Sequence, residues 1–333
     1  MAREELTHNR MNAVTADVWR DGDRVHKVLT GRDDRGPAHW ASSDDPCAWN
    51  SWRREALVYA TDLPARLGLA APRLIDLKDL DGGDVELVLE HVEGRHRDTL
   101  TIDDLAATAL ALGRAQGRPE QPDHPWLSRG FLRGYSTTRA VDWALLHDDD
   151  AWARPLMRAH FPPALRRDLL ALHAHRERLL ALVEHAPRTV AHLDAWPNNI
   201  IMRDDGTPVL IDWAFTGDGA VGEDVANLVP DAVFDLFFDH GDLDAIAERA
   251  TEAYIGGLRD ADWRGTEQDV RRAIAACAVK YDWLTVFCLA EAGRAATDIM
   301  AYGGDAPVDA DARFAARAAG LALCARWAKG ALA

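Results

Sequence analysis

Two short apolar segments, residues 199–202 and 209–213, interrupt the second half of this sequence, which is otherwise rich in Ala and Leu. The polar stretch between them contains Asp, Gly and Pro, which favour a tight turn. This pattern predicts a β-hairpin, whereas the flanking residues 163–185 and 223–333 are predicted to be helical. A hairpin inside a helical region requires a structural or chemical reason.

Oxygen-bearing side chains occur at fixed spacing around this hairpin. The segment His192-x-Asp194-x-x-x-x-Asn199 leads into the first strand, and Asp212 lies on the second. Asp and Asn also favour turns, which would explain each residue taken alone. Turn formation does not explain all of them together with an apolar strand. Phosphoryl transfer would explain the whole set, because this reaction needs a carboxylate to accept a hydroxyl proton and oxygen ligands for Mg²⁺.

The first third of the chain is predicted to be rich in strands. Residues 14–20 and 24–30 flank an Asp-Gly-Asp turn, a hairpin signal because Asp-Gly tolerates the positive φ of a tight turn. Residues 53–67 favour a helix, and residues 85–90 are apolar enough for an interior strand. The sequence therefore predicts an α+β chain.

The segment at residues 192–199 resembles the catalytic loop of the aminoglycoside phosphotransferase and choline kinase-like family, whose members are relatives of the protein kinases. In that family a His-x-Asp-x-x-x-x-Asn loop precedes an apolar strand that ends in a metal-binding Asp. The resemblance implies that Asp194 is the catalytic base and that Asn199 and Asp212 bind Mg²⁺. It also implies that His192 is a structural residue that braces the loop.

Other parts of that family's site occur in the expected order. Lys27 lies on the second predicted strand and Glu55 on the next helix, so the resemblance implies that Lys27 holds the α- and β-phosphates while Glu55 orients it. The backbone of Glu90 and Val92 is expected to meet the adenine edge. Asp224, in the helix that follows the hairpin, matches a structural Asp of the family.

The resemblance implies a protein-kinase-like two-lobe fold. Its small β-rich N-terminal lobe would comprise residues 1–93 and its larger helical C-terminal lobe residues 94–333, with a hinge at about residues 90–94. The cofactors implied are ATP, with GTP left open, and Mg²⁺.

Two stretches depart from the family pattern. Residues 12–16 contain no glycine, although kinases usually place glycine there so that backbone amides can approach phosphate; Thr15 could make this contact instead. In the catalytic loop, Leu193, Trp196 and Asn198 stand where relatives commonly have Gly, His and Gly.

Residues 31–52 form a predicted insertion that carries Trp40, Trp49 and Trp52. Their flat rings would suit stacking on a substrate or a nucleotide. Packing of the loop onto the N-terminal lobe also explains them, and we favour that interpretation.

The net charge of −16 disfavours nucleic acid as a partner. It would suit a cationic acceptor, but acidity also simply keeps a protein in solution, and we favour that interpretation. Asp231, Asp235 and Asp239 recur every four residues, which predicts that they share one helix face. We favour a solvated face; the alternative is a carboxylate cluster, at Asp231 and Asp235, for an aminoglycoside or polyamine-like acceptor.

The sequence gives no sign of export or of a membrane partner. No stretch approaches the roughly 18 apolar residues that a membrane span needs, and the N-terminal residues lack an apolar signal region. The cysteines, Cys47, Cys277, Cys288 and Cys324, lack metal or disulfide spacing and are expected to be reduced. We therefore expect a cytoplasmic protein.

The expected function is ATP-dependent phosphorylation of a hydroxyl on a small molecule, such as an aminoglycoside or other antibiotic, an amino alcohol, a sugar or a nucleoside. The alternative is a weak or inactive nucleotide-binding pseudokinase that acts as a sensor or scaffold, in keeping with the missing glycines. A protein kinase is disfavoured, because Asp-Phe-Gly and Ala-Pro-Glu are absent and about ten residues separate Asp212 from Gly222.

Overall fold

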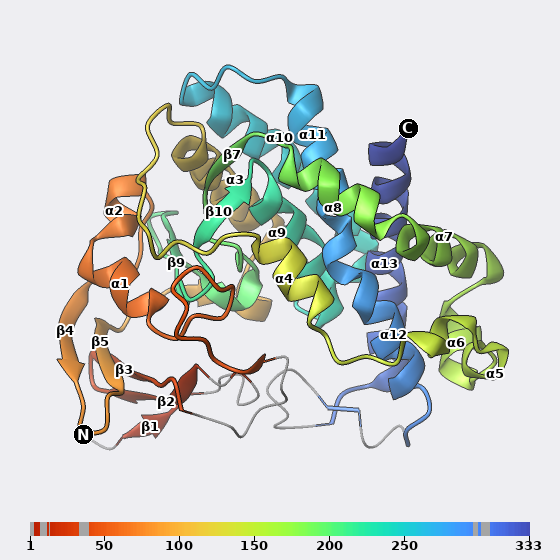
Figure 1. The fold of residues 1–333 in the computed structure, drawn as a ribbon, viewed down its shortest axis with the longest axis horizontal. Coiled ribbons are helices and arrows are strands. Elements are labelled where there is room, and N and C mark those ends of the chain that lie inside the picture. Colours follow the sequence, from red (N-terminus) through yellow and green to blue (C-terminus); the bar gives the residue numbers. More distant parts are fainter. Residues whose placement is uncertain (1–2, 7–11, 13, 33–39, 296–298, 301–306) are drawn as a thin grey trace.

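The computed structural model describes residues 3–6, 12, 14–32, 40–295, 299–300 and 307–333. A smaller, strand-rich lobe contains the N-terminus and lies beside a larger helical lobe that contains the C-terminus (Figure 1). The arrangement confirms the predicted α+β class and the protein-kinase-like, two-lobed architecture.

The N-terminal lobe is built on a five-stranded antiparallel sheet in the order β1-β2-β3-β5-β4. Its strands are β1 (Glu4–Glu5), β2 (Thr15–Asp21), β3 (Arg24–Leu29), β4 (Leu74–Asp79) and β5 (Val85–Glu90). Strands β2 and β3 join at the predicted turn, where Gly22 has a φ of 64°. Lys27 pairs with Val18 on one side and Leu87 on the other, so neighbouring strands fix its position.

The helix predicted for residues 53–67 is two helices, α1 (Arg54–Ala60) and α2 (Leu63–Leu67). Asp62 separates them with a left-handed φ of 52°. Pro64 explains the break, because proline lacks an N–H to continue the first helix but fits the first turn of a new one. Likewise the helix predicted for residues 163–185 is broken near His175.

Helices make up most of the C-terminal lobe. They are α3 (Ile102–Gln116), α4 (Phe131–Thr137), α5 (Asp149–Trp152), α6 (Pro155–His160), α7 (Pro163–Ala174), α8 (Arg176–Glu184), α9 (Glu223–Phe234), α10 (Leu243–Asp260), α11 (Glu267–Ala276), α12 (Asp282–Glu291) and α13 (Ala310–Leu332). Thr101 begins α3 with a capping box, in which its side chain accepts the N–H of Asp104 and the Asp104 side chain accepts the N–H of Thr101. Helices α3 and α10 approach so closely at Gly113 that a Cβ there would lie 2.2 Å from the carbonyl oxygen of Tyr254.

Two small sheets lie in the helical lobe. Strands β8 (Ile200–Met202) and β9 (Pro208–Leu210) form the predicted hairpin, and β6 (Arg95–His96) adds a third strand. The second strand ends earlier than predicted, because Asp212 turns the chain with a φ of 59°. Strands β7 (Arg188–Ala191) and β10 (Gly217–Ala220), which precede and follow this hairpin in the sequence, pair with each other. These two strands were not predicted.

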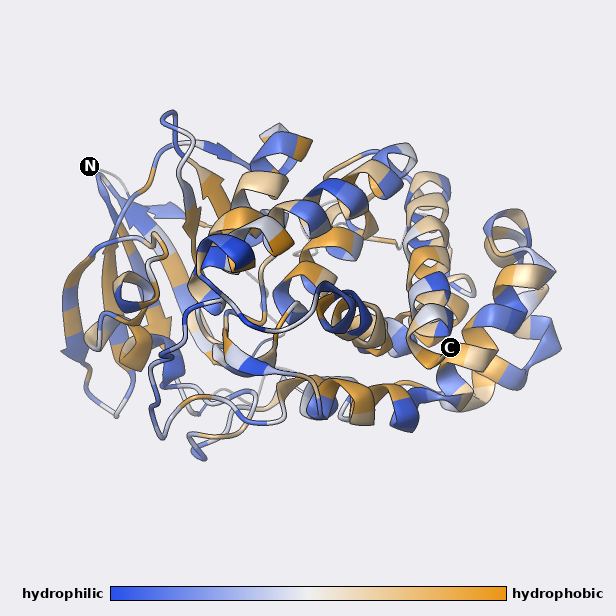
Figure 2. Ribbon diagram, turned by 90° about the horizontal axis from the view of Figure 1, so that it is seen from above, coloured by the Kyte–Doolittle hydropathy of each residue, from blue (hydrophilic) through white to orange (hydrophobic). Residues whose placement is uncertain are grey.

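The segment Glu267–Glu291 has the length and composition of a membrane span, although the sequence analysis found none. Of its most apolar window, 78% is buried inside the protein. The 3-10 helix η6 (Cys277–Tyr281) divides it into α11 and α12. Figure 2 shows that the surrounding helices carry both hydrophilic and hydrophobic residues, as expected where one face meets the core and the other meets water.

Candidate active site

A cavity of about 1390 Å³ is lined by residues of both lobes. The sequence-predicted residues that line it are Lys27, Glu55, Glu90, Val92, Asp194, Asn199, Asp212, Asp231 and Asp235. The cavity therefore brings together residues that are up to about two hundred positions apart in the chain.

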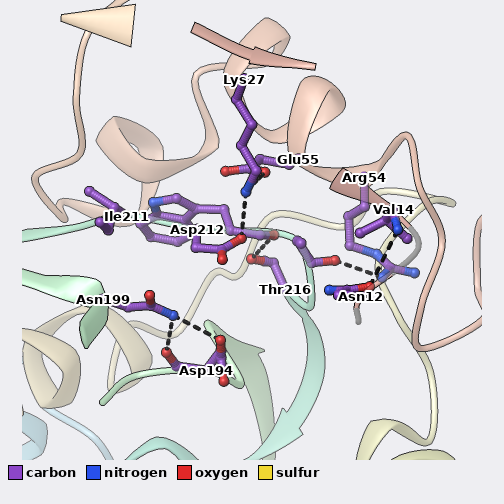
Figure 3. Close-up of polar contacts among 12 residues, drawn as sticks. Asn12, Val14, Lys27, Arg54, Glu55, Asp194, Asn199, Ile211, Asp212 and Thr216 are labelled. Atoms are coloured by element: carbon purple, nitrogen blue, oxygen red, sulfur yellow. Dashed lines mark hydrogen bonds and ion pairs between the residues drawn. The ribbon is translucent and has the colours of Figure 1, made fainter. Parts of the chain in front are cut away.

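Lys27 pairs with one carboxylate from each lobe (Figure 3). Its Nζ lies 2.6 Å from Oε2 of Glu55 on α1 and 2.8 Å from Oδ1 of Asp212. Burial alone would lower the pKa of Lys27, but the charges of Asp212 and Glu55 outweigh it and raise that pKa. Burial also raises the pKa of Glu55. Lys27 therefore remains cationic, and Glu55 holds it in place as the resemblance implies.

Asp194 and Asn199 face each other at the start of the hairpin. The amide Nδ2 of Asn199 donates to Oδ2 of Asp194 at 2.8 Å and to its backbone carbonyl at 3.0 Å (Figure 3). Burial raises the pKa of Asp194 to about 7, aided by the charges of Asp212 and Asp231 and opposed by Lys280. A carboxyl with this pKa can take up a proton near neutral pH, which suits a general base.

His192 braces the loop from behind the cavity. Burial lowers the pKa of its ring, so the imidazole is neutral. Its Nε2 lies 3.1 Å from the carbonyl oxygen of Ile211 and donates to it, while Nδ1 accepts the backbone N–H of Asp194 at 3.3 Å. This one ring thereby ties the segment that carries Asp194 to the one that leads into Asp212.

The side chain of Asp224, in the first turn of α9, binds the backbone of the same loop. Its carboxylate accepts the N–H groups of His192 at 3.0 Å and Leu193 at 2.6 Å, and the amide of Gln116 at 2.6 Å. Leu193 has a φ of 67°, a left-handed conformation that Leu rarely adopts. The loop thus keeps the backbone shape for which relatives commonly use Gly, with Asp224 holding Leu193 in that shape.

The expected hinge residues, Glu90 and Val92, line the cavity. Val92 is buried, and Glu90 donates its backbone N–H to the carbonyl oxygen of Arg73 at 3.0 Å. The Glu90 carboxylate lies 3.2 Å from Nη2 of Arg203. Of the glycine-free loop, residue 13 lies outside the described residues, while Thr15 is buried and lines the cavity. Thr15 is therefore placed for the contact suggested for it.

The three aspartates at four-residue spacing do not share a solvated face, so that prediction is wrong. Helix α9 ends at Phe234, because the chain turns at Leu236 with a φ of 65°. Asp231 accepts a hydrogen bond from the Tyr281 hydroxyl at 2.8 Å, and burial raises its pKa to about 6. Asp239 is exposed and caps the next turn. Asp231 and Asp235 line the cavity, whereas Asp239 does not.

The insertion contacts both lobes, which corrects the expectation that it packs onto the N-terminal lobe alone. Trp52 lies against Gly31 within the N-terminal lobe. Trp40 and Trp49 instead contact Tyr135 of α4 and Phe215, which follows Asp212, at ring-centroid separations of 5.6–6.4 Å. Trp40 thereby becomes part of the cavity wall.

Three functional residues escaped the sequence analysis. Buried Arg54 donates to the carbonyl oxygens of Trp126 and Ala214 and of three insertion residues, and so joins α1 to the segment after Asp212. Arg139 and Lys280 are buried and line the cavity. For Lys280 a signal existed, since a lysine in an apolar helical stretch is seldom buried without a charged or polar partner.

Comparisons with known proteins bear on the family and the fold of this chain. Residues 20–267 match the phosphotransferase enzyme family. The aminoglycoside phosphotransferase of Alicyclobacillus acidocaldarius is 17% identical, with a TM-score of 0.51 over 99% of this chain and 93% of that one. A thermostable mutant of aminoglycoside phosphotransferase APH(4)-Ia, in apo form, is 15% identical, with a TM-score of 0.50 over 99% and 94%.

Choline kinase LicA from Streptococcus pneumoniae is 16% identical, with a TM-score of 0.48 over 97% of this chain and 94% of that one. No curated protein sequence matches the chain. The family match spans most of the sequence, and the matched residues include Asp194 and Asp212. The chain therefore belongs to the phosphotransferase enzyme family and has a protein-kinase-like fold.

Proposed function

We propose that this protein transfers the γ-phosphoryl group of ATP to a hydroxyl of a small molecule. The observation that carries the proposal is that one cavity contains both Lys27, paired with Glu55 and Asp212, and Asp194, paired with Asn199. The first group suits nucleotide phosphates, and the second suits the acceptor hydroxyl.

Asp194 is the proposed general base. It takes the proton of the acceptor hydroxyl as the oxygen attacks phosphorus, and its raised pKa makes it a stronger base than an ordinary carboxylate. Asn199 and His192 hold the carboxylate and its backbone in place. Lys27 donates to the α- and β-phosphates, and the backbone of Val92, with that of Glu90, borders the adenine.

Asn199 and Asp212 are the proposed Mg²⁺ ligands. Among the described residues no cluster of three or more His, Cys, Asp or Glu side chains could enclose a metal. Mg²⁺ does not need one, because it keeps waters and phosphate oxygens and binds through one or two protein oxygens. Bound there, Mg²⁺ would neutralise charge on the transferred phosphate. Asn199 uses its nitrogen for Asp194, so the amide oxygen is the atom for the metal.

Two other functions fit less well. A pseudokinase would not need Asp194 and Asn199 to face Lys27 and Asp212 across one cavity. A protein kinase needs a long peptide-binding segment after the metal-binding Asp, but here residues 217–220 pair with β7 instead. Neither a pseudokinase nor a protein kinase would account for the cavity as a whole, with the Lys27 group on one side and Asp194 with Asn199 on the other.

The test measures ADP release with Mg-ATP across a panel of aminoglycosides, other antibiotics, amino alcohols, sugars, nucleosides and aromatic alcohols. We expect at least one acceptor to stimulate turnover, chelation of Mg²⁺ to abolish it, and Asp212→Asn to reduce it about 10²-fold or more. The matched control is Asp204→Asn, in the exposed hairpin turn. Bound Mg-ATP without acceptor-stimulated ADP release on any compound would favour the pseudokinase.

A further inference from the structure

The acceptor side of the cavity is not acidic, although the chain as a whole carries a net charge of −16. Beyond Asp194, and Asp212, which pairs with Lys27, the acidic cavity residues of the helical lobe are Asp231, Asp235 and Glu291, and the basic ones there include Arg139, Lys280, Arg313 and Arg317. Arg313 lies 3.2 Å from Asp235, and Arg317 pairs with Glu291. Two of the three carboxylates are therefore already neutralised by arginines of α13.

Lys280, in η6, forms no ion pair with a carboxylate of the described residues. Its side chain is buried, and its Nζ lies 5.1 Å from the ring centroid of Tyr135 and 5.7 Å from that of Tyr281. It makes no hydrogen bond or ion pair with any residue in the described ranges. Its charge nevertheless acts on both Asp194 and Asp231. A buried ammonium that makes no direct ion pair is poorly compensated for its lost hydration, so a bound anion in contact with it would stabilise it.

Arg139 follows α4 and is only 8% exposed. Its guanidinium carbon lies 3.9 Å from the ring centroid of Tyr135, 4.4 Å from that of Trp40 and 4.6 Å from that of Trp283. Its Nε and Nη2 have no hydrogen-bond partner in the described part of the chain. Rings cover the guanidinium, but unused N–H groups remain, and such groups favour an oxyanion.

Aromatic rings border these two cations. Trp40 and Phe215 lie stacked at 24° with their centroids 6.4 Å apart, and Tyr135 meets Trp40 at 81°. All three line the cavity that contains Asp194. Such walls favour a flat, unsaturated ring over a heavily hydrated sugar.

We infer that the acceptor is a hydroxylated aromatic carboxylic acid whose carboxylate is bound by Lys280 and Arg139. Its ring lies against Trp40 and Tyr135, and its hydroxyl points to Asp194. This inference rests on the proposed function and names the substrate class of that site. It replaces the cationic acceptor suggested by net charge, because the acceptor side holds unpaired cations while Asp235 is paired with arginine.

The first experiment compares matched acceptors in the ADP-release assay. The probes are 6-(hydroxymethyl)-2-naphthoate, its methyl ester, and the amine in which an aminomethyl group replaces the carboxylate and the hydroxymethyl group is kept. The corresponding benzene compounds form a second set, and streptomycin and choline serve as cationic references. Each charge-assisted hydrogen bond is worth about 1.5–3 kcal/mol, so we expect the carboxylates to have a kcat/KM about 10–100-fold above the esters and amines.

The second experiment assigns this preference to the two cations. Lys280→Met and Arg139→Met should each raise KM for the carboxylates about tenfold or more, leave KM for ATP unchanged and leave the esters unaffected. The matched control is Lys329→Met on the exposed part of α13. A folded Lys280→Met enzyme that loses kcat equally on carboxylates and esters, with KM unchanged, would assign Lys280 to the phosphoryl group and overturn the inference.

Two further outcomes separate the inference from the function on which it rests. Turnover of streptomycin, choline or the amines in preference to the carboxylates, or no preference among the matched sets, overturns the inference and leaves the proposed phosphotransfer standing. Absence of turnover with every compound, although Mg-ATP binds, overturns both.

Discussion

Replacement of Asp224 by Asn tests whether the catalytic loop is held in a strained shape. The carboxylate accepts three hydrogen bonds, two at Oδ2 from His192 and Gln116 and one at Oδ1 from Leu193. Asn keeps one oxygen, which can serve the two donors at Oδ2. Its amide group would then face the N–H of Leu193, and two donors would repel.

The magnitude follows from these contacts. Leaving one buried N–H without an acceptor costs about 1–3 kcal/mol, and neutral bonds are about half as strong as charge-assisted ones. The expected loss in the free energy of unfolding is about 3–4 kcal/mol. Leu193, whose left-handed φ of 67° costs about 1–3 kcal/mol by itself, would relax and displace Asp194. A displacement of about 1 Å lowers kcat about 10²-fold.

Urea unfolding measures the loss in the free energy of unfolding, and the ADP-release assay measures the fall in kcat. Asp204→Asn is the control for loss of a carboxylate. KM for ATP should change little, because Asp224 lies behind the loop and does not line the cavity. An Asp224→Asn protein that unfolds within about 0.5 kcal/mol of wild type and keeps its kcat would refute the reasoning.

Three further predictions concern the base, the contact between lobes and the packing of helices. With a pKa of about 7 for Asp194, kcat/KM should rise with pH up to about 7. Because the folded-state pKa exceeds the unfolded-state value of 3.8, the folded protein binds more protons between these pH values, so stability falls as pH rises through about 4 to 7. Urea unfolding at pH 5 and pH 8 should show this loss, at about 1.4 kcal/mol per pH unit up to about pH 7, and the loss should be smaller in Asp194→Asn. It should not vanish there, because burial also raises the pKa of Asp231 to about 6 and that of Glu223 to about 7. Arg54→Met should lower the free energy of unfolding by about 3–5 kcal/mol, because it leaves buried carbonyl groups without donors; unchanged urea unfolding would contradict this. Gly257→Ala should lose about 1–3 kcal/mol, because its Cβ would lie 2.3 Å from the carbonyl oxygen of Leu110, whereas Gly256→Ala, with 3.9 Å to its nearest atom, should be neutral or stabilising by thermal unfolding.

Local pattern predicted the parts of the site that local structure builds. The spacing from His192 to Asn199 and the turn after it define a loop and a hairpin, and the structure has both. The Asp-Gly turn placed Lys27 on the second strand of a hairpin, and in the structure hydrogen bonds on both sides fix that strand. These features depend on residues that are close in sequence.

What could not be predicted depends on contacts between distant residues. The pairing of β7 with β10, about 30 residues apart, has no turn signal that would reveal it. The three aspartates have helical spacing, but the turn at Leu236 and the arginines of α13 decide which of them reach the cavity. The same holds for Lys280, whose place beside Asp194 depends on how η6 packs against α4 and α9.

The most direct test of the central claim, that Asp194 is the base of a phosphotransferase, compares Asp194→Asn with wild type in two assays on the same samples. Mg-ATP affinity should be unchanged within about twofold, while acceptor-stimulated ADP release should fall about 10²–10⁴-fold. Equal turnover by Asp194→Asn and wild type would contradict the account.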